Sequence, residues 1–371
     1  MTNTYMIDVT DFGGGASVGT GGDDTAAFNA AFAALRTATS GTVLGGPPRT
    51  YHIGGTINAT GLTNSVSTMV SFPGAQILGT TNGGTVIDAL GSRWTTWVGL
   101  NVGTAPGITG RIGMQLGAAG PNMLGDCHTL SGAVFCGQWS LAPLYLFCTE
   151  TSLFSGLKCY NNCTAAGAHA LIVDACNHFG MRSSFVPVTA AVDTPQSYNE
   201  CLFAVPDLRT MGDTPLMIVG ATRRHRYDNG YAECSSSGAA VPGILLIESS
   251  GPSQMLTLDI HIERNISDHI LFDAMTTGPA ATTGVSINGL VVRDHGSEAK
   301  QALFARTANL PSGVHLYNSE LNINPAGNAV LWDDPTAYNF DGRIATWYAP
   351  TFTAPGTIDG ETDIAGVTTA V

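Results

Sequence analysis

The sequence predicts an all-β fold of many short strands, preceded by a single amphipathic helix. Helical periodicity is confined to the first forty residues, whereas apolar runs of strand length recur along the rest of the chain with turn residues between them. Gaps of about 10 to 28 residues between these runs suit a solenoid of roughly ten coils. Since no residue type recurs at a fixed interval, the pattern also fits a jelly roll or another antiparallel sandwich.

The predicted helix begins at Asp23 or Asp24 and stops before Gly41. An aspartate in the N-cap position accepts hydrogen bonds from the free N–H groups of the first turn and places negative charge at the positive end of the helix dipole. One helical face is apolar and consists of Phe28, Ala31, Phe32 and Leu35. Two short strands are expected to follow, at 42–44 and 51–53, around a Gly-Gly-Pro-Pro turn.

Residues 8 to 53 resemble the first segment of a known superfamily. The residues that carry the resemblance are, in order, Asp11-Phe12-Gly13, Asp23-Asp24-Thr25-Ala26-Ala27-Phe28, Gly41-Thr42-Val43-Leu44 and Pro48-Arg49-Thr50-Tyr51-His52-Ile53. Together they look like the beginning of the pectate-lyase-like right-handed parallel β-helix superfamily, which includes polygalacturonase-like enzymes and bacteriophage tailspikes. This chain departs from the superfamily in its first turn, where Gly13-Gly14-Gly15 replaces the usual Gly-Ala.

The resemblance implies an all-β, right-handed parallel β-helix (solenoid) with an N-terminal capping α-helix. A cap makes physical sense because the first coil of a β-helix leaves strand edges and core side chains uncovered. We expect residues 1–41 to form the N-terminal segment and capping helix, 42–334 the parallel β-helix, and 335–371 a C-terminal cap or oligomerisation segment. This last segment concentrates the aromatic residues Tyr338, Phe340, Trp347, Tyr348 and Phe352, which need either the last coil or a neighbouring chain to cover them.

Composition and charge exclude several classes of partner. Only 12% of the 371 residues are charged, 44% are hydrophobic, and the formal net charge is -13. An acidic chain does not suit nucleic acid or an anionic membrane surface, because both favour basic proteins. The first eight residues lack the basic and apolar regions of a secretory leader, and no later run has the length of a membrane span. We therefore expect no membrane insertion, and a virion protein assembled in the host cytoplasm, with an extracellular protein as the alternative.

The eight cysteines include no C-x-x-C pair, so a zinc site is not predicted. Several stand in apolar strings, which favours buried, reduced thiols that pack as small hydrophobic groups. One or more disulfides in an oxidising medium are the alternative. His128, His169 and His178 lie near cysteines in sequence, but their spacing favours structural histidines over a metal site or a nucleophile. We predict neither a metal nor a cofactor.

The clearest candidate for catalysis is the alternating run from Leu258 to Glu263. Its apolar residues would fill the core, so Asp259, His261 and Glu263 would project outward on one line. Such residues bind sugar hydroxyls, or act as acid and base on a glycosidic bond, or simply form a solvated surface.

Distance constrains the catalytic hypothesis. Asp259 and Glu263 would be about 13 Å apart at their Cα atoms, whereas paired glycosidase carboxyl groups are about 5 to 9.5 Å apart. Each would therefore need a carboxylate from an adjacent coil, about 4.8 Å away. The candidates for this role are Glu248, Asp273 and Asp294.

A basic and aromatic cluster is the second candidate site. It consists of Arg223, Arg224 and Arg226, three of only fifteen basic residues, with Tyr227 and Tyr231 close behind. Guanidinium groups bind carboxylates and sulfates, and tyrosine faces pack on sugar rings, so the cluster indicates an anionic polysaccharide as ligand. The alternative is a loop whose arginines pair with local acids such as Asp228 and Glu233.

Together these observations predict a tailspike-like or fibre-like, virion-associated protein that binds a bacterial surface polysaccharide during host attachment, and in one hypothesis depolymerises it. The resemblance to tailspikes implies a homotrimer, and attachment to the virion implies contacts with other virion proteins. The alternatives are a free-standing polysaccharide lyase or glycoside hydrolase, and a structural virion spike without catalytic activity.

Overall fold

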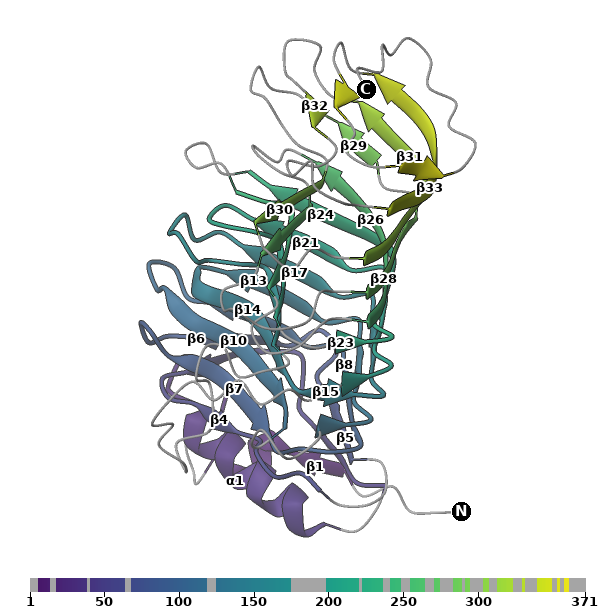
Figure 1. The fold of residues 1–371 in the computed structure, drawn as a ribbon. Coiled ribbons are helices and arrows are strands. Elements are labelled where there is room, and N and C mark those ends of the chain that lie inside the picture. The colour runs from purple at the N-terminus through teal and green to yellow at the C-terminus, as the bar shows by residue number, and fades with distance from the viewer. Residues whose placement is uncertain are drawn as a thin grey trace, which may run out of the picture.

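The structure is a computed structural model. It describes residues 6–13, 18–38, 41–63, 68–118, 125–174, 198–219, 222–235, 241–247, 254–263, 270–273, 283–288, 291–293, 303–306, 312–322, 329–330, 339–348, 352–353 and 357–359. The chain winds as a right-handed parallel β-helix with one α-helix at its N-terminal end (Figure 1). Because every strand pair in the described ranges is parallel, the predicted solenoid is confirmed and the antiparallel sandwich is excluded.

Three ladders of strands form the walls of the solenoid. The first ladder contains β2 (Val43–Gly45), β5 (Thr68–Ser71), β8 (Thr95–Val98), β12 (Thr129–Ser131), β16 (Leu153–Ser155) and β20 (Leu202–Ala204). The second contains β3 (Thr50–Ile53), β6 (Gln76–Gly79), β9 (Asn101–Thr104), β13 (Val134–Gly137), β17 (Lys158–Asn161) and β21 (Asp207–Thr210). The third contains β4 (Ile57–Asn58), β7 (Thr85–Leu90), β10 (Gly110–Gly117), β14 (Trp139–Phe147), β18 (Leu171–Asp174), β22 (Leu216–Val219), β25 (Ile244–Ile247), β27 (Ile270–Asp273) and β30 (Leu303–Arg306).

The first two ladders merge further along the chain. Single long strands, β24 (Arg226–Cys234) and β26 (Gln254–Glu263), continue both of them. They are followed by β28 (Thr283–Asn288), β29 (Val291–Arg293), β31 (Ser312–Asn322), β33 (Asn339–Tyr348) and β35 (Thr357–Asp359). Further short strands pair as follows: β11 (Gly125–Asp126) with β15 (Thr149–Glu150), β19 (Tyr198–Asn199) with β23 (Thr222–Arg223), which also pairs with β26, and β32 (Ala329–Val330) with β34 (Phe352–Thr353).

The interior of the solenoid is an apolar stack in strict register. Phe154, Phe203 and Tyr227 occupy successive coils and are fully buried. The ring of Phe203 stacks on Phe154 at a centroid distance of 4.7 Å and on Tyr227 at 4.4 Å. Since adjacent coils are about 4.8 Å apart, flat rings at equivalent positions fill the core at stacking distance.

Helix α1 (Thr25–Thr37) covers the open end of this core, as predicted. All four residues of its expected apolar face are buried. Phe28 contacts Tyr51 edge-to-face at 5.2 Å and stacks on Phe72 at 5.5 Å, so the helix packs on aromatic residues of the first coils. The short β1 (Met6–Asp8) precedes it, pairs with β2, and leads into a 3-10 turn, η1 (Val9–Phe12).

The two aspartates at the start of α1 accept hydrogen bonds from different backbone N–H groups. Asp24 is the N-cap residue by position, but its carboxylate accepts hydrogen bonds from the N–H groups of Gly19 and His52. Asp23 accepts from the N–H groups of Thr25 and Gly54 instead. Both carboxylates therefore connect the helix to the surrounding chain, so they fix the cap on the solenoid.

Left-handed backbone turns stack at one corner of the solenoid, between the first and second ladders. Gly132, Gly156, Val205 and Asn229 follow one another there with φ values of 60°, 61°, 54° and 49°. The glycines adopt this conformation without strain. Val205 is β-branched, so its backbone is strained in this conformation. Its side chain is 59% exposed, so burial of the side chain does not offset the strain.

Cysteines and histidines are mainly packing residues in the described part of the chain. Cys148, Cys159, Cys163, Cys201 and Cys234 are buried, as predicted, whereas Cys127 is half-buried, Cys136 is exposed and Cys176 lies outside the described residues. The ring nitrogen Nδ1 of His128 lies 2.8 Å from the hydroxyl of Thr95, and that of His169 lies 3.0 Å from the carbonyl of Thr214. Both histidines are buried structural residues, as expected, while His178 lies outside the described ranges.

The C-terminal strands continue the same parallel ladder. Strand β33 pairs with β31 on one side and with β35 on the other. The division of the chain at residue 335 stays a prediction. Within the described residues, no helix is both long enough and apolar enough to cross a membrane.

Candidate functional site

Polar side chains on the outer face of β17, β21, β24 and β26 form the candidate site. They lie in two columns, because alternate residues of a strand point outward and equivalent residues of successive coils stack in register. We call this set the outer wall; its described members are Lys158, Tyr160, Asp207, Arg209, Tyr231, Glu233 and His261. The intervening residues Cys159, Leu208, Ala232 and Ile262 are buried in the core.

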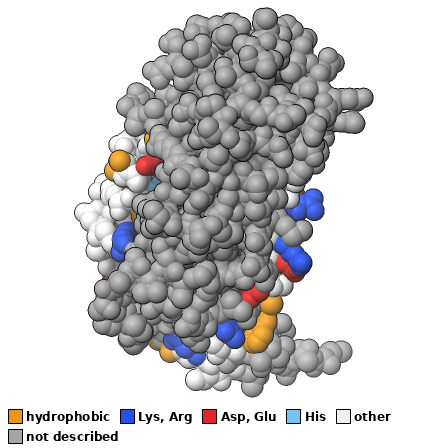
Figure 2. Space-filling model, in the orientation of Figure 1, with side chains coloured by type: hydrophobic (Ala, Val, Ile, Leu, Met, Phe, Trp, Pro, Cys, Tyr) orange, Lys and Arg blue, Asp and Glu red, His pale blue; other side chains and the backbone are white. Residues whose placement is uncertain are grey.

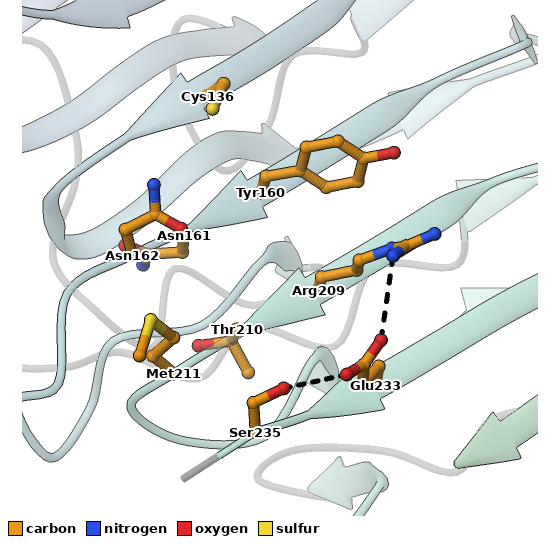
Figure 3. Close-up of a pocket in the computed structure, with 9 residues that line it drawn as sticks. All are labelled: Cys136, Tyr160, Asn161, Asn162, Arg209, Thr210, Met211, Glu233 and Ser235. Atoms are coloured by element: carbon orange, nitrogen blue, oxygen red, sulfur yellow. Dashed lines mark hydrogen bonds and ion pairs between the residues drawn. The ribbon is translucent and has the colours of Figure 1, made fainter. Parts of the chain in front are cut away.

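A pocket of about 370 Å³ opens at the outer wall (Figure 3). Nine residues of the described chain line it: Cys136, Tyr160, Asn161, Asn162, Arg209, Thr210, Met211, Glu233 and Ser235. They come from β13, β17, β21, β24 and the turns that follow these strands. Asn161 and Thr210 are buried and bonded within the protein, so Arg209, Glu233 and Ser235 are among the polar groups of the pocket that a ligand would meet.

Arg209 lies at the centre of the outer wall. Its guanidinium donates to both carboxylate oxygens of Asp207, with Nε–Oδ1 at 2.8 Å and Nη2–Oδ2 at 3.2 Å, and its Nη1 lies 3.7 Å from Oε2 of Glu233. The same group lies 5.2 Å from the ring centroid of Tyr160 and 4.9 Å from that of Tyr231. The hydrogen bonds with Asp207 are the main reason that the pKa of Arg209 is raised. Two carboxylates and two aromatic rings therefore hold this cation in place.

The two carboxylates each accept a hydrogen bond from a tyrosine. The hydroxyl of Tyr160 donates to Asp207 at 2.5 Å, and the hydroxyl of Tyr231 donates to Glu233 at 3.0 Å. Ser235 also donates to Glu233, at 2.7 Å. Burial, followed by the hydrogen bond to Asp207, raises the pKa of Tyr160 to about 12, so its hydroxyl stays protonated and can donate across the neutral range.

The outer wall places two carboxylates on neighbouring coils. Asp207 is in register with Tyr231, and Arg209 is in register with Glu233, so Asp207 and Glu233 are diagonal neighbours. Diagonal neighbours in a sheet are about 7 to 8 Å apart. That spacing refers to backbone positions, and the two carboxylates converge on the guanidinium of Arg209. The wall therefore has groups that bind sugar hydroxyls and two carboxylates on neighbouring coils that contact one cation.

The predicted outward line at 259, 261 and 263 is partly described. Leu258, Ile260 and Ile262 are buried and Asp259 and His261 are half-buried, so the alternation is as predicted. The ring of His261 lies 5.8 Å from that of Tyr231, which makes it part of the outer wall. The backbone of Glu263 is in register with Glu233, but its side chain lies outside the description.

The three carboxylates expected on adjacent coils do not take that role in the described structure. Glu248 and Asp294 lie outside the described residues. Asp273 ends β27 of the third ladder, in register with Ile247 and Arg306, so its prediction as a neighbour of β26 is wrong. An apolar run marks a strand, but it does not show which wall of the solenoid the strand joins. The adjacent-coil carboxylate is instead Glu233, which had been considered only as a partner for arginine.

The basic cluster has the local acidic partners of the alternative interpretation. Arg226 donates to Asp228 at 2.6 Å, and Arg224 pairs with Glu200 on the neighbouring coil. Arg223 lies in β23, and its side chain is outside the description. These pairs leave fewer guanidinium donors for a ligand than the sequence suggested.

The prediction that Tyr227 binds sugar at the surface is wrong, because Tyr227 lies in the core. Its ring is fully buried and burial raises its pKa well above the usual value. Tyr227 and Tyr231 are separated by an even number of positions, which predicts the same face. A bulge breaks this relation: Tyr227 pairs with Leu258 whereas Gly230 pairs with Ile260, so β24 has one additional residue.

The sequence interpretation missed Tyr160, Asp207 and Arg209. Each stands in a run in which one apolar residue separates two outward side chains, Lys158-Cys159-Tyr160-Asn161 and Asp207-Leu208-Arg209-Thr210. The alternation would have identified outward residues, as it did at 259–263. The runs are only four residues long and were not recognised as strands, and the sequence does not show that coils separated by many residues bring them side by side.

Comparison with known proteins supports the fold. The Dettilon tailspike protein superposes with a TM-score of 0.52 at 13% identity, covering 97% of this chain and 68% of that one. ORF18 of Geobacillus virus E2 gives a TM-score of 0.49 at 10% identity, covering 90% of this chain and 61% of that one. Pectate lyase Pel9A gives 0.38 at 12% identity, with 90% and 73% covered. This chain thus spans less than two thirds of the Geobacillus virus protein.

No protein-family model and no curated protein matches this chain. The chain has a parallel β-helix fold similar to that of the Dettilon tailspike protein, so the fold implied by the resemblance in residues 8–53 is confirmed. At such low identity, the similarity carries no site residue across. In the described part of the chain, no group of three or more His, Cys, Asp and Glu side chains is arranged to hold a metal ion.

Proposed function

We propose that this protein binds a bacterial surface polysaccharide along the outer wall. The observation that carries the proposal is the arrangement around Arg209, whose guanidinium contacts two carboxylates and two tyrosine rings from three coils. Arg209, Tyr160 and Glu233 of this arrangement line a pocket of about 370 Å³. Sugar hydroxyls both donate and accept hydrogen bonds, so carboxylates and a guanidinium on one surface suit them. Arg209 is 47% exposed at its side chain and Asp207 is 20% exposed, so both are accessible to a ligand.

The biological setting is part of the proposal. The Dettilon protein is a tailspike, and a fold shared with it favours a virion-associated role in host attachment. A homotrimer, with contacts to other virion proteins, is the corresponding assembly. The C-terminal segment from 335 onward, rich in aromatic residues, is the proposed oligomer contact or cap.

Binding to purified polysaccharides tests the main proposal. Capsular and lipopolysaccharide fractions of candidate hosts are immobilised, and the affinity of the intact protein is measured. Arg209→Ala should weaken binding at least 10-fold, because it removes the donor at the centre of the pocket. Arg111→Ala is the matched control: Arg111 is exposed on β10 in the third ladder, away from the outer wall. Equal loss in both variants, or binding by neither the wild type nor the variants, would contradict the proposal.

Cleavage is the second candidate function, and the diagonal arrangement of Asp207 and Glu233 favours it. In hydrolysis, one carboxyl group protonates the leaving oxygen and the other activates water or attacks the sugar. Glu233 is 7% exposed and receives hydrogen bonds from Tyr231 and Ser235, so it is the better-positioned of the two to act inside the pocket. Asp259 and Glu263 remain proposed contributors from the next coil.

Product analysis separates binding from cleavage. A bound polysaccharide is incubated with the protein, and new reducing ends and unsaturated uronates are measured. Hydrolysis predicts reducing ends that are lost in Glu233→Gln while binding is retained. If wild-type protein binds the polysaccharide and produces neither product, the protein is a binding protein and the cleavage proposal fails.

A further inference from the structure

The charges along the outer wall and its flanking corner are paired with one another. Arg209 shares two hydrogen bonds with Asp207 and lies 3.7 Å from Glu233. Arg226 pairs with Asp228, and Arg224 pairs with Glu200. Each of these three guanidinium groups therefore already has a carboxylate in contact. Basic and acidic side chains also lie close together along one edge of the described surface in Figure 2.

The balance of described charges on this face does not favour an anion. The cations are Lys158, Arg209, Arg224 and Arg226, and the carboxylates are Asp207, Glu233, Asp228, Glu200 and Asp259. Lys158 itself lies beside Asp207 in register. The face thus has no excess of positive charge, in a chain whose formal net charge is -13.

An anionic sugar would be repelled by the carboxylates beside Arg209. On the Nε–Nη2 side of Arg209, its carboxylate or sulfate would have to replace Asp207 as the bidentate partner. On the Nη1 side, it would have to bind beside Glu233. It would then lie close to both Asp207 and Glu233, where like charges repel. A neutral sugar needs no exchange of this kind. Its hydroxyls can donate to Asp207 and Glu233 and accept from the exposed part of Arg209 while the existing ion pairs stay intact.

We propose that the outer wall selects a neutral polysaccharide, without regularly spaced carboxylate or sulfate groups, and that Asp207 is the residue that excludes anionic chains. This inference rests on the proposed glycan-binding function and reverses the sequence-based expectation of an anionic ligand. It also limits the chemistry: β-elimination needs a uronate, so a neutral ligand leaves hydrolysis as the mode of cleavage.

A panel of soluble polysaccharides tests the selectivity. Neutral hexose and deoxyhexose polymers, polyuronates and sulfated glycans are titrated with the wild-type protein at roughly 50 mM and roughly 500 mM NaCl. Exposed charges are screened weakly at the lower salt concentration and strongly at the higher one. We expect binding confined to neutral members, with affinity changing less than 2-fold with salt. Preferential binding of a polyuronate or sulfated glycan, weakened 10-fold or more by salt, would overturn the inference while leaving the binding function intact. No binding to any member would remove the proposed function and this inference together.

The Asp207→Asn variant tests the mechanism of exclusion. It keeps the shape of the side chain, removes one carboxylate from Arg209, and should raise affinity for a polyuronate at least 5-fold. Glu200→Gln is the matched control, because it makes the same change in charge beside Arg224, outside the pocket. Thermal melting verifies that both variants fold. Equal affinities of the two variants for the polyuronate would show that Asp207 does not exclude anions.

Discussion

The inner and outer columns of this solenoid share one backbone spacing but use it in opposite ways. Inside, Phe154, Phe203 and Tyr227 stack like on like at 4.7 and 4.4 Å. Outside, Tyr160, Arg209 and Glu233 are equivalent residues of successive coils, and unlike groups stand next to each other. The inner column removes aromatic surface from water and stabilises the fold. The outer column brings opposite charges together near solvent, where they add little stability but can recognise a ligand.

The largest expected effect is on the inner column. Phe203→Ala leaves a cavity between two stacked rings and should lower the free energy of unfolding by about 3 to 5 kcal/mol. Lys158→Ala, an exposed residue of the outer wall, should change it by no more than about 0.5 kcal/mol. Chemical denaturation of both variants measures the difference. Similar losses would show that the two columns do not differ in their contribution to stability.

A buried histidine beside the inner column should make the fold sensitive to acid. His225 is fully buried, neither ring nitrogen has a hydrogen-bond partner, and burial lowers its pKa to about 4. Between this value and about 6.5, the unfolded chain binds the proton more readily, so the stability falls as the pH falls through this window. The loss from this group should reach roughly 3 kcal/mol at pH 4.

His225→Leu removes this titration and should flatten the dependence of stability on pH. Denaturation of wild type and variant at pH 7 and pH 4 gives the comparison. The variant should lose less stability than the wild type on acidification, by roughly 3 kcal/mol. An identical loss in both proteins would show that His225 is protonated in the folded state.

Removing the central cation of the outer wall should separate stability from binding. Arg209→Ala should cost less than about 1 kcal/mol of folding stability, because its ion pairs are partly exposed. The same variant should lose at least 10-fold in glycan affinity. A loss of several kcal/mol would identify the network as a structural element of the fold, and would weaken the functional interpretation of the outer wall.

The smallest expected effect is at the corner between the first and second ladders. Val205 holds φ at 54° while exposed, and Asn tolerates this conformation better than a β-branched residue. Val205→Asn should therefore raise the free energy of unfolding by about 1 kcal/mol. Gly156→Val, at φ 61° on the neighbouring coil, is the reciprocal control and should lower it by at least that amount. Loss of stability in Val205→Asn would show that the valine side chain has a packing role.

The sequence predicted the fold better than the site. The cap helix is recognisable because Phe28, Ala31, Phe32 and Leu35 follow local periodicity, and local order is also what the resemblance in residues 8–53 uses. The outer wall depends on contacts between coils, and intervals between stacked residues vary along the chain. One additional residue near Asn229 determines which tyrosine faces solvent, and Asp273 lies in the third ladder rather than beside β26.

A structure with a bound oligosaccharide tests the central claim most directly. A neutral fragment released from the recognised polysaccharide would be crystallised with the intact protein. We expect sugar hydroxyls at hydrogen-bond distance from Arg209, Asp207 and Glu233, with the Arg209–Asp207 ion pair retained. A fragment bound on the third ladder or at a contact between chains, with no sugar at Arg209, would contradict the assignment of the outer wall as the binding surface.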